Sequence, residues 1–239
     1  MEHWESFKPG GFRFVYDDTL FRPGTDSFLL SSLPHLKAGL RVCDLGCGTG
    51  LISLLLLQRQ PELSVTGIDI QPAAIQLGQK AIQENLLNDR LHFTCADLRN
   101  VRDLFSTGSF DLVVCNPPYY TEQSGKVSAC DALRMARSES ACSLDDICRS
   151  AAYLLRWGGS FCLVHKPERL TDLLCALRNA AIEPKRMRFV CDRTNAAPSL
   201  VLVEGRRGGK PGLTVEAPLS LHELSGLPTP EVDAIYFRT

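Results

Sequence analysis

The chain has 239 residues and a net charge of −1 at pH 7, with a hydrophobic fraction of 44% and a charged fraction of 22%. These values are ordinary for a globular protein, and the net charge neither favours nor excludes a nucleic-acid partner. No apolar run approaches the roughly 18 residues of a membrane helix, and the acidic start MEHWESF has no apolar signal segment. The sequence therefore predicts a cytoplasmic protein with no membrane partner.

The ten cysteines predict neither disulfides nor a zinc site. Cys43, Cys95, Cys115, Cys162 and Cys191 lie inside apolar runs, where a free cysteine behaves as a small hydrophobic residue. No C-x-x-C pair occurs and the histidines stand singly, so zinc ligation is not expected. We expect buried structural thiols and no metal.

The predicted elements alternate between strands and helices along most of the chain. The first forty residues contain a strand at 12–16 and a helix that begins near Thr25 or Asp26. From residue 41 onward, strands are predicted at 41–46, 64–70, 91–98, 110–116 and 160–166, and helices at 50–60, 72–86, 143–159 and 168–180. The helix at 143–159 is predicted to have Ser143 as its N-cap and Gly158 as its end.

The last predicted strands, 186–192 and 199–205, are joined by a short connection, which indicates an antiparallel pair. The alternation before them predicts an α/β fold, because near-continuous apolar strands separated by helices form a parallel sheet covered on both faces. We expect a Rossmann-like, mostly parallel, doubly wound sheet with an antiparallel strand near the C-terminus. The tail at 211–239 is expected to be loop with one or two edge strands.

Polar side chains follow four of the predicted parallel strands. They are Asp44, Asp69, Asp97 and Asn116. In open α/β sheets the ligand site lies outside the carboxyl ends of the strands, so these four side chains are expected to meet in one site.

The loop DLGCGTG (44–50) predicts a nucleoside cofactor. Its three glycines allow a sharp turn and close approach of the backbone to a ligand. Asp69 follows about twenty residues later at the end of the next strand, where an acid binds ribose hydroxyls. The spacing G-x-G-x-G departs from the dinucleotide fingerprint, and the carboxylate of Asp44 suits a cofactor with an ammonium group and a sulfonium, such as S-adenosylmethionine.

We then expect Asp97 to accept a hydrogen bond from the exocyclic amine of the cofactor's adenine, and the backbone N–H of Leu98 to face a nitrogen of the adenine ring. The alternative for any single aspartate is a helix cap or a turn. The predicted cofactor-binding residues are Asp44, Gly46, Cys47, Gly48, Gly50, Asp69, Ile70, Asp97, Leu98 and Asn116.

The segment Asn116-Pro117-Pro118-Tyr119 is unusual for the end of an apolar strand. An exocyclic amine is a poor nucleophile because its lone pair is delocalised into the ring, and two acceptors aimed at its hydrogens, the Asn116 oxygen and the Pro117 carbonyl, favour the reactive geometry. The prolines remove competing N–H donors, and Tyr119 offers a stacking face worth about 1–3 kcal/mol. This predicts catalysis by positioning, without a strong base, by Asn116, Pro117, Pro118 and Tyr119. The alternative is a rigid turn.

Together the motifs DLGCGTG, GIDIQ, CADL and NPPY resemble those of class I S-adenosylmethionine-dependent methyltransferases that act on a planar amino nitrogen. More narrowly, the chain resembles the bacterial tRNA adenine-N6 methyltransferases that modify the adenine beside the anticodon, position 37, of a valine tRNA. The resemblance runs nearly end to end and includes GTDSFLL (24–30) and LLRWGGSFCLVHKPERL (154–170). The Lys-Val that usually precedes Gly-Thr-Asp in that family is Arg22-Pro23 here.

The resemblance implies S-adenosyl-L-methionine as cofactor, S-adenosyl-L-homocysteine as product and tRNA as partner, and it adds Thr25 and Asp26 to the cofactor-binding residues. It divides the chain into an N-terminal strand-helix segment at 1–40 that packs on the domain and covers the cofactor, a methyltransferase domain at 41–210 and a C-terminal extension at 211–239. The sequence leaves the oligomeric state open, a monomer included.

Two groups of basic residues are candidates for RNA contacts. Residues 156–210 contain 11 basic against 5 acidic residues, which indicates a positive surface or, equally, solvated strand ends and helix faces. The candidates there are Lys166, Arg169, Lys185, Arg186, Arg188, Arg206, Arg207 and Lys210. The segment 121–140, with Lys126, Arg134 and Arg137, is expected to be a lid or to be disordered without RNA.

Other substrates remain compatible with these motifs. One alternative is N5-methylation of glutamine in release factors, although that family carries a helical domain before its glycine loop and only 43 residues precede Asp44 here. Another is adenine-N6 methylation of ribosomal RNA or DNA. A module that binds the cofactor or RNA without turnover would leave the NPPY segment idle.

Overall fold

The computed structural model describes residues 1–18, 20, 24–117 and 142–238. Its N-terminal segment is an antiparallel hairpin of β1 (Glu2–Ser6) and β2 (Arg13–Asp17), followed by helix α1 (Thr25–Ser32). The prediction for the start of α1 is confirmed. The sequence predicts only the second strand of the hairpin, because EHWES lacks an apolar pattern.

One large sheet contains all the remaining strands. In spatial order they are β10 (Thr214–Val215), β8 (Ile182–Arg193), β9 (Pro198–Arg207), β7 (Leu155–His165), β6 (Phe110–Cys115), β3 (Arg41–Leu45), β4 (Ser64–Asp69) and β5 (Leu91–Cys95), and β11 (Leu219–His222) also pairs with β8. Strands β7, β6, β3, β4 and β5 are parallel, and β9 is antiparallel to both β7 and β8. The predicted fold class, a mostly parallel α/β sheet with an antiparallel strand near the C-terminus, is confirmed.

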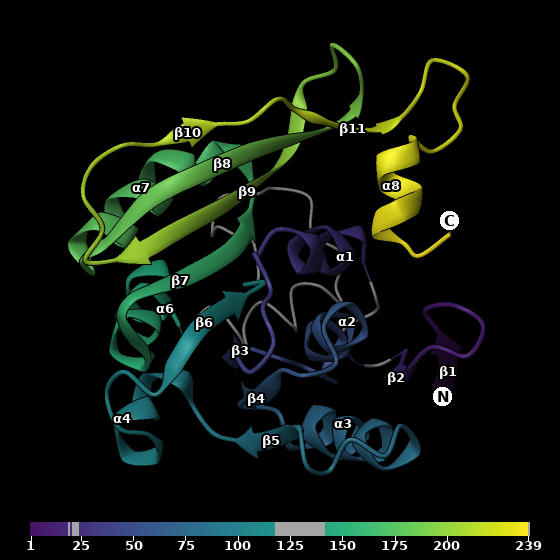
Figure 1. Cartoon of the computed structure of the whole chain (residues 1–239), viewed down its shortest axis with the longest axis vertical. Coiled ribbons are helices and arrows are strands. Elements are labelled where there is room, and N and C mark those ends of the chain that lie inside the picture. Colours follow the sequence, from purple (N-terminus) through teal and green to yellow (C-terminus); the bar gives the residue numbers. More distant parts are fainter. Residues whose placement is uncertain (19, 21–23, 118–141, 239) are drawn as a thin grey trace.

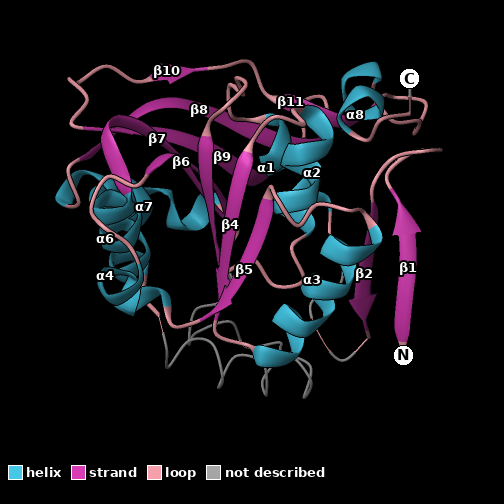
Figure 2. Cartoon of the chain, turned by 60° about the horizontal axis from the view of Figure 1, so that its bottom comes forward, coloured by secondary structure: helices cyan, strands magenta, loops and turns pink. Residues whose placement is uncertain are grey.

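Helices cover both faces of this sheet (Figure 2). On one face lie α1, α2 (Leu51–Arg59) and α3 (Pro72–Glu84), and on the other α4 (Val101–Leu104), α6 (Leu144–Leu154) and α7 (Leu170–Asn179). Short 3-10 turns, η1 (Leu98–Asn100) and η2 (Pro167–Arg169), precede α4 and α7, and α8 (Pro230–Ile235) lies near the C-terminus. None of the described helices has the length and apolar character needed to cross a membrane.

The central strands β3 and β6 are mostly apolar because both of their faces are largely buried. In β3, Val42 packs with α1, α2 and α3, whereas the next residue, Cys43, packs with α6 and α7, and neither is exposed. In β6, Val113 and Val114 divide in the same way between the two faces. This alternation fixes which face each polar residue at a strand end reaches.

The helix predicted at 143–159 ends earlier than expected. Its start is confirmed, since Ser143 and Asp146 form a reciprocal capping box. However, α6 ends at Leu154, and the predicted terminator Gly158 lies inside β7. The reason is tertiary, because Leu155 pairs with Phe110 of β6 and its carbonyl accepts a hydrogen bond from Arg207.

The C-terminal extension closes one edge of the sheet. Strands β10 and β11 run parallel to β8 along its outer side, as the predicted edge strands, while α8 was not predicted (Figure 1). Tyr236, just after α8, stacks on Phe28 of α1 with ring centroids 4.3 Å apart. Val232 and Ile235 belong to the same buried cluster as Phe14 of the hairpin, so the N-terminal segment, the sheet and the extension share one core.

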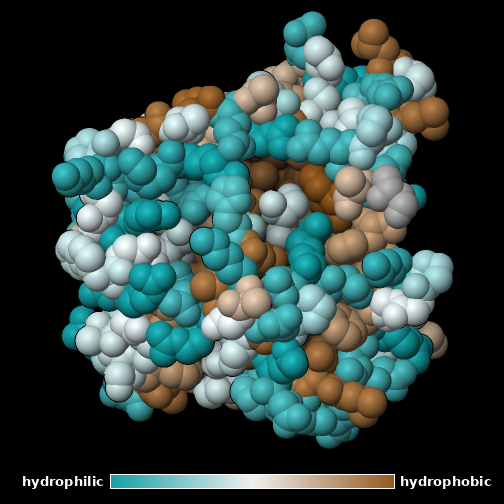
Figure 3. Space-filling view, in the orientation of Figure 1, coloured by the Kyte–Doolittle hydropathy of each residue, from teal (hydrophilic) through white to brown (hydrophobic). Residues whose placement is uncertain are grey.

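The face of the molecule seen in Figure 3 is mostly hydrophilic. Hydrophobic side chains are visible there mainly in a hollow beside α1 and at the upper right, over the loop between β11 and α8. In that loop Leu224 and Leu227 are exposed.

Phe93 of β5 occupies a space bounded by three glycines. A Cβ atom added to Gly50, Gly67 or Gly78 would lie 2.1, 2.6 or 2.7 Å from a carbon of its ring. These glycines come from the start of α2, from β4 and from α3, so the ring fixes how closely the glycine loop, the sheet and α3 approach one another. Phe93 itself is only 8% exposed.

We predict that Gly78→Ala lowers the free energy of unfolding by about 1–3 kcal/mol, because the new methyl group overlaps the Phe93 ring. In an unobstructed helix the same change would stabilise the protein by about 0.5–1 kcal/mol. In a Phe93→Leu background the penalty should shrink or change sign. Urea denaturation of the four proteins of this cycle measures the coupling, and equal effects in both backgrounds would contradict the packing described here.

Candidate active site

The carboxyl ends of four neighbouring strands bring the predicted site residues to one edge of the sheet, the lower edge in Figure 2. Strands β6, β3, β4 and β5 are adjacent and parallel, and Leu45 of β3 is paired both with Ile68 of β4 and with Cys115 of β6. The glycine loop therefore leaves the sheet between Asp69 and Asn116. The predicted convergence of these groups agrees with the strand order and register.

Asp44 is a fully buried carboxylate with one oxygen unsatisfied. Its Oδ2 accepts hydrogen bonds from the Ser53 hydroxyl at 2.7 Å and the Ser53 backbone N–H at 3.1 Å. Its Oδ1 has no hydrogen-bond partner among the described residues. Burial raises the pKa of Asp44 to about 7, against the opposing effect of the Ser53 hydrogen bonds. A buried acceptor without a donor is costly, so the described residues alone do not account for this carboxylate.

The glycine loop adopts a conformation that residues with side chains rarely take. Gly46, Gly48 and Gly50 all have positive φ angles, of 72°, 56° and 86°. The N–H of Gly46 donates to the carbonyl of Ile68 at 2.8 Å, which ties the loop to the end of β4. Cys47, within the loop, is buried and packs with the core on the α1–α3 face.

Asp69 connects this loop to the start of α3. Its Oδ2 accepts from the N–H of Gly48 and its Oδ1 from the N–H of Gln71, each at 2.8 Å. It is 8% exposed, and burial raises its pKa. The neighbouring Ile70 is 51% exposed, an unusual exposure for an isoleucine beside a buried acid. A carboxylate and an apolar side chain are thus presented together at this edge.

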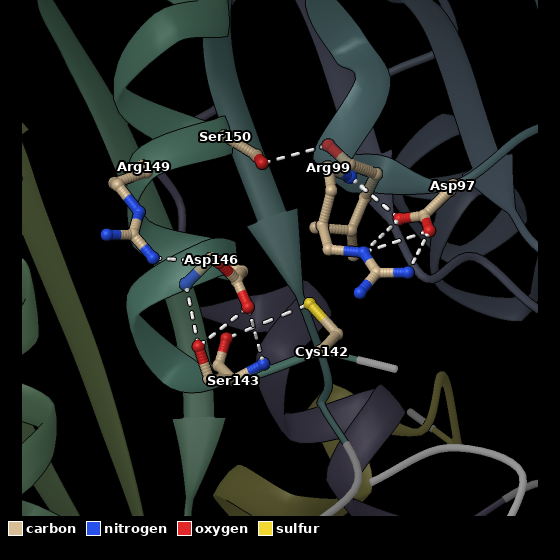
Figure 4. A network of polar contacts seen from close by, with 8 residues as sticks. Asp97, Arg99, Cys142, Ser143, Asp146, Arg149 and Ser150 are labelled. Atoms are coloured by element: carbon tan, nitrogen blue, oxygen red, sulfur yellow. Dashed lines mark hydrogen bonds and ion pairs between the residues drawn. The ribbon is translucent and has the colours of Figure 1, made fainter. Parts of the chain in front are cut away.

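Asp97 is bound by Arg99, a partner that the sequence did not predict. Figure 4 shows Asp97 and Arg99 facing each other, and both carboxylate oxygens accept hydrogen bonds from Arg99, through its backbone N–H and its guanidinium. Hydrogen bonding to Arg99 lowers the pKa of Asp97. The carbonyl of Leu98 accepts from the Ser150 hydroxyl of α6 at 2.9 Å. An adenine amine at Asp97 would therefore share the carboxylate with Arg99.

Asn116 follows β6 and is held from the α1 side. Its Nδ2 donates to the hydroxyl of Ser27 at 3.5 Å. Ser27 lies in the first turn of α1, directly after Thr25 and Asp26, so these predicted residues belong to the same helical turn as the residue that contacts Asn116. The sequence analysis missed Ser27, for which the only signal is its place in the GTDS segment.

Two predicted catalytic residues, Pro118 and Tyr119, lie outside the described residues. The same holds for Lys126, Arg134 and Arg137 in the segment expected to form a lid. Their roles stay predictions.

Several basic residues proposed to contact RNA are paired with carboxylates inside the protein. Arg169 contacts Asp172 at 2.6 Å and Arg186 contacts Glu204 at 2.8 Å. Arg188 forms two hydrogen bonds with Glu231. These pairs reduce the positive charge that residues 156–210 offer to phosphates.

The cysteine prediction is confirmed at four of five positions. All described cysteines are free, and Cys43, Cys115, Cys162 and Cys191 are buried. Cys95 is exposed, contrary to expectation, because β5 ends there at the open edge of the sheet. No cluster of ligating side chains that could hold a metal is found within the described ranges.

Comparisons with known proteins place this arrangement among methyltransferases. Residues 15–174 match the family model described as the methyltransferase small domain. A protein of Flavobacteriaceae bacterium strain 3519-10, named tRNA1(Val) (adenine(37)-N6)-methyltransferase, is 31% identical over 70% of this chain and 75% of its own length. A protein of the same name from Yersinia pseudotuberculosis is 31% identical over 65% of this chain and 63% of its own length.

Solved structures share the fold at lower identity. A predicted O-methyltransferase from Agrobacterium tumefaciens superimposes with a TM-score of 0.74 at 22% identity, covering 89% of this chain and 96% of that protein. A geranyl diphosphate methyltransferase in complex with SAM superimposes with a TM-score of 0.54 at 16% identity, covering 75% and 83% of the two chains. The fold is that of the methyltransferases.

We predict that Asp44 makes the ligand-free protein less stable as the pH rises. Its folded-state pKa of about 7 lies above the usual aspartate value, so between about pH 4 and pH 7 the folded state binds more protons than the unfolded state. The resulting loss is on the order of a few kcal/mol and is complete above about pH 7. Asp44→Asn retains an acceptor for Ser53 but does not titrate.

The stability gained by Asp44→Asn should therefore grow between pH 4 and pH 7, as measured by urea denaturation of both proteins at each pH. Ser53→Ala serves as a comparison, since it removes the hydroxyl donor and should enlarge the pH-dependent loss. A stability difference between wild type and Asp44→Asn that is constant with pH would contradict the raised pKa.

Proposed function

The chain belongs to the methyltransferase small domain family and is a methyltransferase, and from this premise we propose that it transfers a methyl group from S-adenosyl-L-methionine to the N6 atom of an adenine in tRNA. The observation that carries the proposal is the placement of Asn116 and Pro117 beside the glycine loop, at the shared end of β6 and β3. The proposed base is adenine 37 of a valine tRNA, which is the substrate in the names of the two relatives.

The residues at the sheet edge fit S-adenosylmethionine. The unsatisfied Oδ1 of Asp44 is an acceptor for the ammonium of the methionine part, and Asp69 is an acceptor for the ribose hydroxyls beside the backbone of Gly48. The exposed side chain of Ile70 and the segment at Leu98 suit the faces of the adenine ring. When bound, the cofactor supplies a methyl group on a positively charged sulfur.

The role of Asn116 is to prepare the substrate nitrogen. Its Oδ1 and the carbonyl of Pro117 accept the two amine hydrogens, which turns the nitrogen lone pair out of the plane of the base. Pro117 is buried, its ring restricts its φ angle, and the proline that follows it in the sequence restricts its ψ angle, so the direction of its carbonyl is limited before substrate arrives. The gain comes from positioned dipoles in a site with little water. No strong base is needed, because the nitrogen becomes acidic once methylated and its proton then leaves to solvent.

The two buried acids are poorly suited to act as bases on the substrate. Asp44 and Asp69 are engaged by Ser53 and by the backbone of the glycine loop, and both lie on the cofactor side of Asn116. Their chemistry matches cofactor binding.

Because the proposed substrate is a tRNA, we also propose that the reaction takes place in the cytoplasm.

The substrate proposal is tested by methyl transfer from isotopically labelled cofactor to tRNA, ribosomal RNA, DNA and release factor, each in a separate reaction. We expect label in tRNA, released on nucleoside analysis as N6-methyladenine and mapped to position 37 of valine tRNA. Label in the release factor alone would support the glutamine alternative, and label in ribosomal RNA or DNA would support the other adenine substrates.

We predict that Asn116→Ala lowers kcat by about 100- to 1,000-fold, the usual effect of removing one preorganised polar group from the reacting centre. Cofactor affinity should change by less than about threefold, because Asn116 acts on the substrate amine. Asn100→Ala, the same change at an exposed position of η1, is the control and should be fully active. Near-normal turnover of Asn116→Ala would refute the proposed role.

We also predict that cofactor binding at pH 6 releases close to one proton. Asp44 is mostly protonated there and must ionise to pair with the ammonium of the cofactor, whose own pKa near 8 leaves it charged throughout. Calorimetry of S-adenosylhomocysteine binding in buffers of different ionisation enthalpy counts this proton. Asp44→Asn should release none, whereas Asp69→Asn should still release most of it. Equal proton release by wild type and Asp44→Asn would contradict the assignment.

A further inference from the structure

We infer that Ser27 is a positioning residue that holds the side-chain amide of Asn116 with Oδ1 turned toward the substrate amine. This inference rests on the proposed function. It is carried by a contact between segments 89 residues apart, the first turn of α1 and the end of β6.

The hydroxyls of the three serines of α1 have different partners. Ser31 and Ser32 donate to the carbonyls of Phe28 and Leu29, one turn back in the same helix, each at 2.7 Å, and the Ser31 hydroxyl also accepts from Arg59 of α2 at 3.1 Å. The Ser27 hydroxyl instead accepts from Nδ2 of Asn116 at 3.5 Å, in another element of the fold. Ser27 is only 2% exposed, so water cannot readily substitute for it. Such bonds are often long without substrate and shorten in the reactive complex.

The geometry of a planar amide makes this contact directional. Both polar atoms of Asn116 lie in its amide plane, on different edges of the group, so an Nδ2 that faces Ser27 turns Oδ1 in another direction. In the reverse orientation, Nδ2 would point its own hydrogens at the hydrogens of the substrate amine. With substrate bound, only the first orientation is productive, and Ser27 supplies the acceptor that Nδ2 then needs. Without this acceptor, Nδ2 loses the hydrogen bond that sets this orientation.

Ser27 is presented by a helix that is held firmly in place. Leu29 and Leu30 of α1 are completely buried. At its C-terminal end, the carbonyl of Leu33 accepts a hydrogen bond from Arg186 of β8, and Phe28 stacks on Tyr236 with an interplanar angle of 7°. A hydroxyl on such a rigid support can fix the rotamer of its partner.

The test is a double-mutant cycle between Ser27→Ala and Asn116→Ala. We expect Ser27→Ala alone to lower kcat by about 10- to 100-fold, the effect of losing one hydrogen bond that orients the amide. KM for tRNA and the cofactor Kd should each change by less than about threefold. In the Asn116→Ala background, Ser27→Ala should cause no further loss, because its only route to the reaction has been removed. Ser27→Thr, which keeps the hydroxyl, should recover most of the activity.

Ser32→Ala is the matched control, since it removes a hydroxyl from the same helix that bonds only to that helix. It should leave kcat unchanged. Full activity of Ser27→Ala, an equal fold-loss from Ser27→Ala in both backgrounds, or a loss of cofactor binding that matches the loss of kcat would each overturn the inference.

A second readout separates this inference from the proposed substrate. Hydrogen exchange of the Asn116 side-chain amide, followed by NMR in protein labelled with nitrogen-15 at asparagine, reports the Ser27 contact without any turnover. Faster exchange in Ser27→Ala than in Ser32→Ala supports the contact even where none of the tested substrates accepts a methyl group. Equal exchange in the two variants refutes it.

Discussion

The parallel pairing of β3 with both β4 and β6 is the constraint on which the site depends. Leu45 is level with Ile68 on one side and Cys115 on the other, so the glycine loop, Asp69 and Asn116 leave the sheet at almost the same height. Because side chains alternate between the faces of a strand, a slip of one residue in β6 would turn Asn116 toward α6 and away from Ser27. The register therefore selects both the place and the direction of the Asn116 amide, the proposed catalytic group.

The same edge carries a group that opposes folding. Asp44 is completely buried with one oxygen unsatisfied, and the protein holds it there with two hydrogen bonds from Ser53. A smaller apolar residue would remove the desolvation cost, so stability alone does not account for a carboxylate at this position. A positively charged ligand group would account for the carboxylate, because it would donate to the unsatisfied oxygen and favour the ionised form of Asp44. Under the proposed function, the local instability at Asp44 serves cofactor recognition.

The sequence was sufficient to predict the features that depend on the local pattern of apolar and polar residues. Apolar runs located the parallel strands, and the polar residues after them were correctly expected at one edge of the sheet, since strand direction alone brings those ends together. The sequence did not predict the contacts between distant segments. The end of α6 depends on Leu155 pairing with Phe110, and Asp97 is bound by Arg99, whose side chain could equally have faced solvent. The carboxylate partners of Arg186 and Arg188 likewise come from strands and a helix that only the fold assembles.

The asparagine stands at the boundary between the sheet and the segments outside it. The sheet supplies its backbone, but its side-chain partner comes from α1, and α1 is fixed in turn by Arg186 and by Tyr236 after α8. The buried cluster that joins Phe14, Leu29 and Val232 makes the N-terminal segment and the C-terminal extension parts of one packed unit with the sheet. Loosening the extension would therefore remove the Tyr236 ring that packs on α1, one of the contacts that hold this helix. The orientation of the proposed catalytic amide thus depends on contacts from three parts of the fold, the sheet, the N-terminal segment and the extension.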